Sequence, residues 1–176
     1  TTCTAAAPIG LVGFDADDTL WKSEDYYRAA EKHFLDIVGE YIDITDAQTA
    51  GHLLAVERRN LSIYGYGAKG MTLSMLEAAI EMTAGRISTA HLGAILQIGH
   101  DTLRHPVQLL DGVREAVAAI AACYPVVLIT KGDLFHQESK IQRAGLGDIL
   151  PRIEIVSEKD PATYARVLAE FNVPAE

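Results

Sequence analysis

The sequence has little of what a disulfide scaffold, a nucleic-acid surface or a membrane span would need. Its two cysteines, Cys3 and Cys123, are too few for a framework of several disulfides or for a metal site made of cysteine thiolates. The 24 acidic residues outnumber the 15 basic ones, giving a net charge of −9, so we expect no nucleic-acid and no membrane partner. No apolar run reaches the length of about 18 residues that a spanning helix requires. These absences favour a soluble protein of a reducing, cytoplasmic compartment.

The remaining composition is that of a folded globular chain. Apolar residues make up 49% of the 176 residues and charged residues 22%, and no repeat or low-complexity tract interrupts the sequence. The six histidines are scattered, without the i,i+4 pair and distant acid of a zinc site. A chain of this length makes one domain, or one domain with a small insert.

Two separated regions have the pattern of an α/β domain. The apolar run Ile9–Phe14, which lies between a proline and an acidic cluster, is typical of a buried parallel strand. After Pro106, helix and strand patterns alternate again, with Asp111 and Asp160 as expected helix N-caps and Gly145 as a helix stop. The elements expected in this second region are helix 112–122, strand 124–130, helix 134–144, strand 152–156 and helix 161–171.

The segment between these regions has only helical periodicity. Four helices are expected, at 23–42, 45–65, 72–83 and 88–103. Their proposed N-caps are Ser23, Thr45, Thr72 and Ser88. The sequence therefore predicts a Rossmann-like, three-layer α/β core with a parallel sheet, formed by residues 1–20 and 106–176, and an inserted α-helical domain at 21–105.

Chemically useful residues follow each predicted strand. The first strand ends at Asp15, the second at Thr130, and the third runs toward Lys159. Ligands of open α/β sheets bind beyond the carboxyl ends of the strands, so these side chains are expected together. A carboxylate, a hydroxyl and an ammonium suit attack on a phosphate monoester. Asp17 could donate a proton to the leaving oxygen and later take one from the attacking water. The gathered negative charge calls for a divalent cation, most simply Mg²⁺.

Three motifs resemble those of the haloacid dehalogenase superfamily: DADDT at 15–19, ITKGD at 129–133 and EKDP at 158–161. The resemblance implies that Asp15 is the nucleophile and a metal ligand, and that Asp17 is the general acid and base, with its carbonyl on Mg²⁺. It further implies that Thr130 and the Lys131 amide hold the phosphate and that Lys159 steadies the nucleophile. An Asp at position 17 favours phosphate esters, because the dehalogenase branch usually has an uncharged residue there.

The inserted segment resembles the helical cap of that superfamily. Its loop IYGYGAKGMT contains Tyr64, Tyr66 and Lys69, which with Trp21 are the expected substrate contacts. The superfamily's fourth motif, which completes the metal site, does not occur before the sequence ends at Glu176. We therefore expect the chain to continue beyond Glu176, because otherwise the first strand would be an exposed sheet edge. An uncovered edge or cap surface would also allow a homodimer.

The sequence thus predicts a Mg²⁺-dependent phosphatase that acts on a small phosphorylated metabolite through an aspartyl-phosphate. Two alternatives stay open. One is a phosphotransferase or mutase that uses the same intermediate. The other is a non-catalytic phosphate-binding or phospho-acceptor module, which the helical insert of about 85 residues disfavours.

Overall fold

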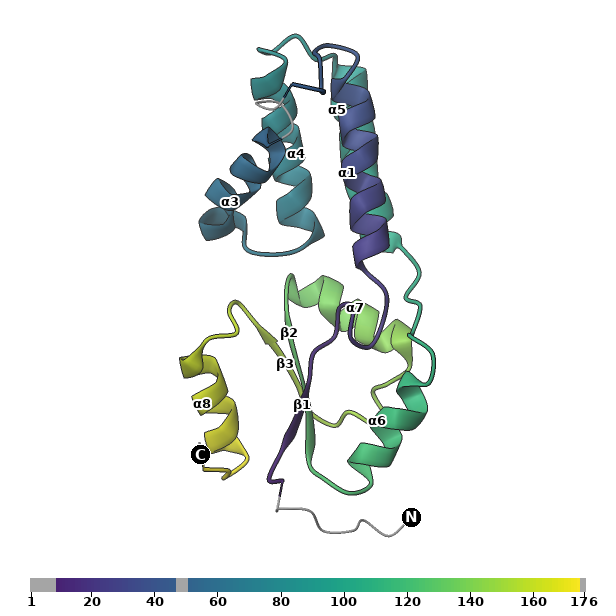
Figure 1. Ribbon diagram of the computed structural model, residues 1–176, viewed down its shortest axis with the longest axis vertical. Helices are drawn as coiled ribbons and strands as arrows, with labels where there is room; N and C mark the ends of the chain where they lie inside the picture. Colours follow the sequence, from purple (N-terminus) through teal and green to yellow (C-terminus); the bar gives the residue numbers. More distant parts are fainter. Residues whose placement is uncertain (1–8, 47–50, 175–176) are drawn as a thin grey trace. The chain divides into compact units, whose positions relative to one another are not determined.

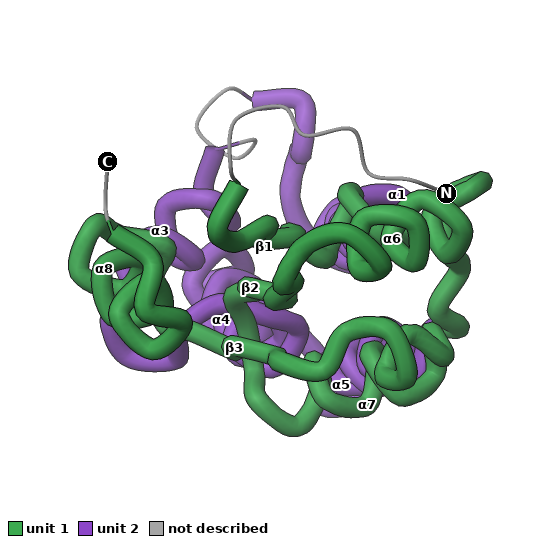
Figure 2. Tube along the Cα trace, turned by 90° about the horizontal axis from the view of Figure 1, so that it is seen from below, with its two compact units in different colours: residues 1–22, 106–176 green, residues 23–105 purple. Residues whose placement is uncertain are grey.

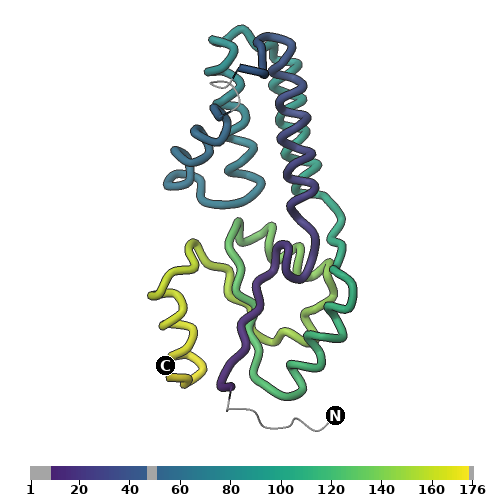
Figure 3. Tube along the Cα trace, viewed as in Figure 1, coloured from purple at the N-terminus to yellow at the C-terminus, as the bar shows by residue number. Residues whose placement is uncertain are grey.

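The chain divides into two compact units, each described by itself. The computed structural model describes residues 9–46 and 51–174, so Cys3 lies outside the described part. Residues 1–22 and 106–176 form one unit, the α/β unit, and residues 23–105 form the other, the helical unit (Figure 2). This division falls two residues later than the expected boundary at 20/21. The α/β unit is therefore assembled from two segments that are far apart in the sequence (Figure 3).

The α/β unit contains a parallel sheet of three strands. Strands β1 (Val12–Phe14), β2 (Val126–Lys131) and β3 (Ile153–Val156) follow the order β1-β2-β3. All three expected strands are confirmed. The first is shorter than Ile9–Phe14, because its pairing begins where Val12 lies opposite Val126. Among the described strands, β1 is an edge of the sheet.

Helices cover both faces of this sheet. Helices α6 (Val113–Ala121) and α7 (Leu134–Ala144) lie on one face and α8 (Pro161–Glu170) on the other (Figure 1). Alternate residues of β2 are buried against the two layers: Val126 and Leu128 belong to a cluster with residues of α6 and α7, whereas Val127 and Ile129 pack with Val167 of α8. This arrangement confirms the three-layer α/β fold class.

Most helix ends of the α/β unit follow the sequence signals. Asp160 accepts a hydrogen bond from the Thr163 amide at 2.8 Å, and Pro161 opens α8. Gly145 ends α7 with a left-handed backbone, φ 65°. Asp111 was wrongly predicted as a cap. The residue before α6 is Gly112, whose φ of 74° suits glycine better than a residue with a side chain.

The helical unit contains α1 (Glu24–Val38), α3 (His52–Tyr64), α4 (Ala68–Met82) and α5 (Thr89–Arg104). Helix α4 packs against α3 and α5, and α5 packs against α1. The buried apolar residues that all four helices contribute form one cluster, which includes Phe34, Val56, Met75 and Ile95. Within the described residues, no helix is both long and apolar enough to cross a bilayer.

The expected helix starts of this unit need correction. The Ser88 side chain accepts a hydrogen bond from the His91 amide, as predicted, whereas Ser23 precedes α1 without a capping bond. Thr45 instead bonds to the Asp43 carboxylate, and α3 begins at His52; the intervening positions 47–50 lie outside the described residues.

Helix α4 begins four residues before its predicted start. Thr72 lies inside it and its hydroxyl donates to the Ala68 carbonyl at 2.6 Å. The early start follows from Gly65 and Gly67, whose φ angles of 68° and 117° reverse the chain within three residues.

Candidate active site

The residues predicted from the three motifs meet at the carboxyl edge of the sheet. Asp15 directly follows β1, Thr130 and Lys131 end β2, and Lys159 lies three residues beyond β3. Because the strands are parallel, these ends share one edge. All of these residues belong to the α/β unit.

Asp15 is held by one lysine and remains accessible. The Lys159 ammonium donates to its Oδ1, and the Thr19 hydroxyl lies 3.3 Å from its Oδ2. The Asp15 side chain is 47% exposed, whereas that of Lys159 is 22% exposed. The lysine therefore orients the carboxylate while the Asp15 side chain stays accessible to a substrate, as a nucleophile requires.

The Asp17 carboxylate points toward the interior of the unit. Its Oδ1 accepts hydrogen bonds from the Trp21 indole at 2.7 Å and from the Lys140 ammonium at 2.5 Å. Its Oδ2 accepts one from the Gln137 amide at 2.9 Å. Trp21, an expected substrate contact, is fully buried and supports Asp17 instead.

A tight turn places the two carboxylates. The Ala16 carbonyl accepts hydrogen bonds from the amides of Thr19 and Leu20. Asp18 takes a left-handed backbone with φ 58°, and its amide donates to the Trp21 carbonyl at 2.8 Å. Aspartate tolerates this conformation better than most residues. Asp18 therefore shapes the turn.

Thr130 is buried at the end of β2, with 1% of its surface exposed. Its Oγ1 accepts a hydrogen bond from the Gln137 amide at 3.0 Å and lies 3.4 Å from the Lys131 carbonyl, a long distance for its own donation. The Lys131 ammonium lies 3.4 Å from Glu158. The Thr130 hydroxyl oxygen thus accepts a hydrogen bond from Gln137 of α7, whereas the hydroxyl hydrogen has only a long, weak contact with the Lys131 carbonyl.

Sequence reasoning missed the α7 side chains that complete this network. His136, Gln137 and Lys140 are all buried. Burial lowers the pKa of Lys140, although the nearby Asp17 carboxylate acts to raise it. Burial, and to a smaller extent the positive charge of Lys140, lowers the pKa of His136 to about 4. Positions 137, 140, 141 and 144 share one face of the predicted helix. Polar residues among its apolar ones were the available signal.

The donors at this edge fit an oxygen-preferring cation only in part. In the described part of the chain, no three His, Cys, Asp or Glu side chains gather as a metal cluster. Mg²⁺ commonly takes one or two carboxylates together with substrate phosphate and water. The exposed Asp15 carboxylate and the Asp17 backbone carbonyl are donors of that kind, so the residues present fit such a cation when a phosphate supplies further oxygens.

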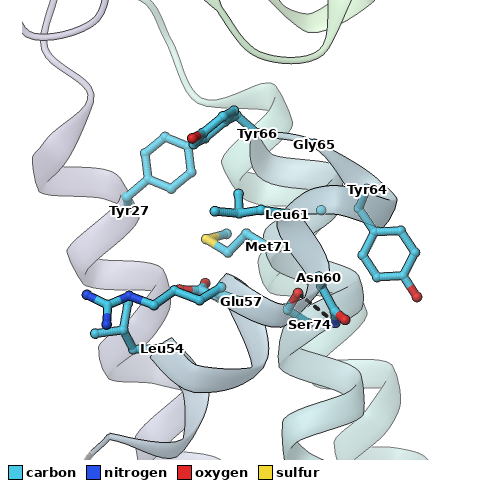
Figure 4. Close-up of a pocket in the computed structure, with 13 residues that line it drawn as sticks. Tyr27, Leu54, Glu57, Asn60, Leu61, Tyr64, Gly65, Tyr66, Met71 and Ser74 are labelled. Atoms are coloured by element: carbon cyan, nitrogen blue, oxygen red, sulfur yellow. Dashed lines mark hydrogen bonds between the residues drawn. The ribbon is translucent and has the colours of Figure 1, made fainter. Parts of the chain in front are cut away.

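The expected substrate contacts of the inserted segment belong to the helical unit. Tyr64 and Tyr66 line a pocket of about 370 Å³ between α1, α3 and α4, whereas Lys69 is exposed and lies outside its lining. In Figure 4 the Tyr66 ring lies toward Tyr27, and the Tyr64 ring points away from both. Burial, followed by the charge of Glu31, raises the pKa of Glu57 in this pocket.

Comparisons with known proteins give a consistent result. A family model, described as a haloacid dehalogenase-like hydrolase, matches residues 9–176. The crystal structure of a haloacid dehalogenase-like family hydrolase from Xanthomonas campestris is 67% identical, with a TM-score of 0.89, over 96% of this chain and 70% of that one. No curated protein matches.

More distant structures share the fold. A 2-haloacid dehalogenase from Pseudomonas syringae is 23% identical, with a TM-score of 0.61, over 96% of this chain and 75% of that one. A predicted phosphoglycolate phosphatase from Haemophilus somnus is 17% identical, with a TM-score of 0.55, over 93% and 72% of the two chains. Since both chemistries occur on this fold, the reaction must be argued from the side chains.

Proposed function

The chain belongs to the haloacid dehalogenase-like hydrolase family, and on that premise we propose that it is a Mg²⁺-dependent phosphatase of a small phosphorylated metabolite. The observation that carries this proposal is a pair of carboxylates with separate lysines beside a buried hydroxyl. Asp15 bonds to Lys159, Asp17 bonds to Lys140, and Thr130 lies at the same edge of the sheet.

In the proposed first step, an Asp15 carboxylate oxygen attacks phosphorus and the bond from phosphorus to the ester oxygen breaks. Asp17 donates its proton to that leaving oxygen. In the second step, water attacks the phosphorus of the aspartyl-phosphate, gives a proton back to Asp17 and releases inorganic phosphate and the Asp15 carboxylate.

The surrounding side chains stabilise the charge of the transferring group. Lys159 lies against Asp15, where its ammonium can also contact a phosphoryl oxygen, and the Thr130 hydroxyl and Lys131 amide would bind two others. Mg²⁺, when bound through Asp15 and the Asp17 carbonyl, would reduce the repulsion between carboxylate and phosphate. Lys159 alone offsets only one of the negative charges that would meet there.

The helical unit would act as the cap that contacts and selects the leaving group, with Tyr64 and Tyr66 as its contacts.

A mutase reaction uses the same first step and differs in the acceptor, so only the products distinguish it. A dehalogenase needs no group that protonates an ester oxygen. Asp17, whose carboxyl group could supply that proton two residues after the proposed nucleophile, is therefore the residue that favours the phosphatase.

The test is a panel of phosphate monoesters and 2-chloropropionate, each incubated with the purified protein in Mg²⁺ or in EDTA. We expect phosphate release that requires Mg²⁺ and no chloride release. Chloride release without phosphate release would overturn the proposal. Transfer of phosphate to an added sugar would replace it with the phosphotransferase. An Asp15→Asn variant serves as the control for contaminating phosphatases.

A further inference from the structure

We propose that Lys140 and Gln137, two buried α7 side chains outside the three motifs, are the positioning residues of Asp17 and Thr130. The inference rests on the proposed function, because it assigns these side chains to the proton-transfer step and the phosphate contact. Neither residue would touch the reacting phosphorus. Each would act by fixing the orientation of a group that does.

Lys140 fixes one oxygen of Asp17 and so selects the other for proton transfer. Oδ1 accepts hydrogen bonds from both the Lys140 ammonium and the Trp21 indole. These two bonds occupy both lone pairs of Oδ1. Among the described residues, Oδ2 accepts only from Gln137 and keeps one lone pair. Trp21 is fully buried and Lys140 is 3% exposed, so neither donor can move without disrupting packing. Oδ2 is therefore the oxygen available to give and take a proton.

Gln137 connects the proton-transfer group to the phosphate-binding hydroxyl. Its amide nitrogen lies 2.9 Å from Asp17 Oδ2, 3.0 Å from Thr130 Oγ1 and 2.5 Å from the Lys131 carbonyl. Two hydrogens cannot satisfy three acceptors at once. Rotating the amide would place its oxygen against a carboxylate and a carbonyl, which both only accept. In the arrangement in which its two hydrogens go to Asp17 and Thr130, Gln137 leaves the threonine hydrogen for a phosphate oxygen.

The network is costly in a way that packing does not explain. Gln137 is 2% exposed, and its Oε1 has no hydrogen-bond partner within the described residues. A buried ammonium and an unpartnered buried carbonyl oxygen both lower stability relative to apolar side chains. Such groups persist where function needs them. A purely structural ion pair would require Lys140 and Asp17 but no shared amide between Asp17 and Thr130.

The activity test compares two esters in the Lys140→Met variant. Arg143→Met, an exposed cation on the same helix, is the matched control. With ethyl phosphate, whose leaving oxygen needs a proton, we expect phosphoryl transfer to fall about 100-fold. With p-nitrophenyl phosphate, the first burst should be kept and the phosphoenzyme should accumulate in intact-mass spectra, because Asp17, no longer held by Lys140, is poorly placed to take the proton from water. Equal losses on both esters without accumulation would overturn the inference.

A second readout does not depend on activity. Trp21 is the only tryptophan in the sequence, so its indole N–H gives a single NMR signal that reports the bond to Asp17. We expect faster solvent exchange of this proton in Lys140→Met and unchanged exchange in Arg143→Met and Lys140→Arg. Unchanged exchange in Lys140→Met would overturn the positioning role. If the wild type cleaves neither ester, the proposed phosphatase fails while this signal still decides whether Lys140 holds Asp17.

Gln137→Met provides the remaining test, and it decides the outcome if Lys140→Met does not fold. Loss of the Thr130 partner should raise KM for p-nitrophenyl phosphate and slow its burst, each by about tenfold, which corresponds to one net hydrogen bond. Unchanged KM and burst rate would show that the amide does not position the hydroxyl. Circular dichroism of every variant establishes that it is folded.

Discussion

The buried threonines of the helical unit and the buried polar side chains around Asp17 in the α/β unit are satisfied in different ways. In the helical unit, the buried hydroxyls of Thr72, Thr83 and Thr102 each donate to the carbonyl four residues earlier in the chain. In the α/β unit, the buried polar groups of Thr130, Gln137 and Lys140 bond to residues of other elements. Locally satisfied groups fit the demands of a helix. Groups satisfied across elements instead fix the relative positions of reactive side chains.

The ion pairs differ in the same sense. Arg59 of α3 bonds to Glu77 and Glu81 of α4 at the surface, where hydrogen bonds from Asn60 and Arg59 lower the pKa of Glu77. In the pair with Asp17, the Lys140 side chain is largely removed from water, and burial lowers the pKa of the lysine. Surface pairs contribute little to stability. The difference shows that the position of a charge, more than its presence, distinguishes a functional group from a solvated one.

The largest expected effect comes from breaking the α/β network at its exposed carboxylate. Asp15→Asn should abolish phosphoenzyme formation and lower turnover by about 10⁴-fold or more, because an amide oxygen is a poor nucleophile. Intact-mass spectra and phosphate release measure the two effects. Asp18→Asn is the control, since asparagine also accepts the left-handed backbone found there. Normal turnover in Asp15→Asn would contradict the proposed mechanism, in which the Asp15 carboxylate attacks phosphorus.

The next largest effect is the dependence of stability on pH that the buried His136 should cause. Burial, followed by the Lys140 charge, lowers the pKa of His136 from 6.5 to about 4. Its contribution to stability is therefore complete above pH 6.5 and is lost as pH falls toward about 4, because the unfolded chain takes up the proton first. The slope is at most about 1.4 kcal/mol per pH unit. Urea unfolding at pH 7, 6 and 5 should show a shallower decline for His136→Gln, and an equal decline would contradict this assignment.

A smaller effect is expected where helices α4 and α5 of the helical unit pack closely together. A Cβ at Gly99 of α5 would overlap the Thr72 side chain of α4. Gly99→Ala should therefore lower the free energy of unfolding by about 1–3 kcal/mol. Gly93→Ala is the matched control, because nothing lies within 4 Å of its Cβ position on the same helix. Phosphoenzyme formation should not change in either folded variant. Equal stability of the two variants would refute the packing argument.

The smallest effect should follow from removing a hydroxyl that is satisfied within its own helix. Thr102→Val removes the hydroxyl that donates to the Ile98 carbonyl but leaves that carbonyl within the backbone of the helix. We therefore expect a stability loss of no more than about 1 kcal/mol. Chemical denaturation measures it. A loss as large as that of Gly99→Ala would mean that the bond to the Ile98 carbonyl does not satisfy the Thr102 hydroxyl as described.

Much of the α/β unit could be predicted from the sequence because its signals are local. Helix 134–144 has the predicted bounds, and Asp160 caps α8 as expected. The meeting of Asp15, Thr130 and Lys159 at one edge follows from parallel strands alone. The start of α4 could not be predicted from Thr72, because two glycines set it upstream.

The α7 contribution was not predicted because it depends on tertiary structure. A lysine in a helix is usually exposed, and only the position of Lys140 beside Ile141 on the inner face indicates burial. Its partner Asp17 is 123 residues away in the chain. No local pattern encodes that distance.

The pairing of β1 with β2 also has a consequence for synthesis on the ribosome. Val12 emerges early and Val126 much later, with the whole helical unit between them. At a translation rate of about 5–20 residues per second, β1 waits on the order of ten seconds for its neighbour. The helices between them can form during that delay, since their contacts are closer in the sequence.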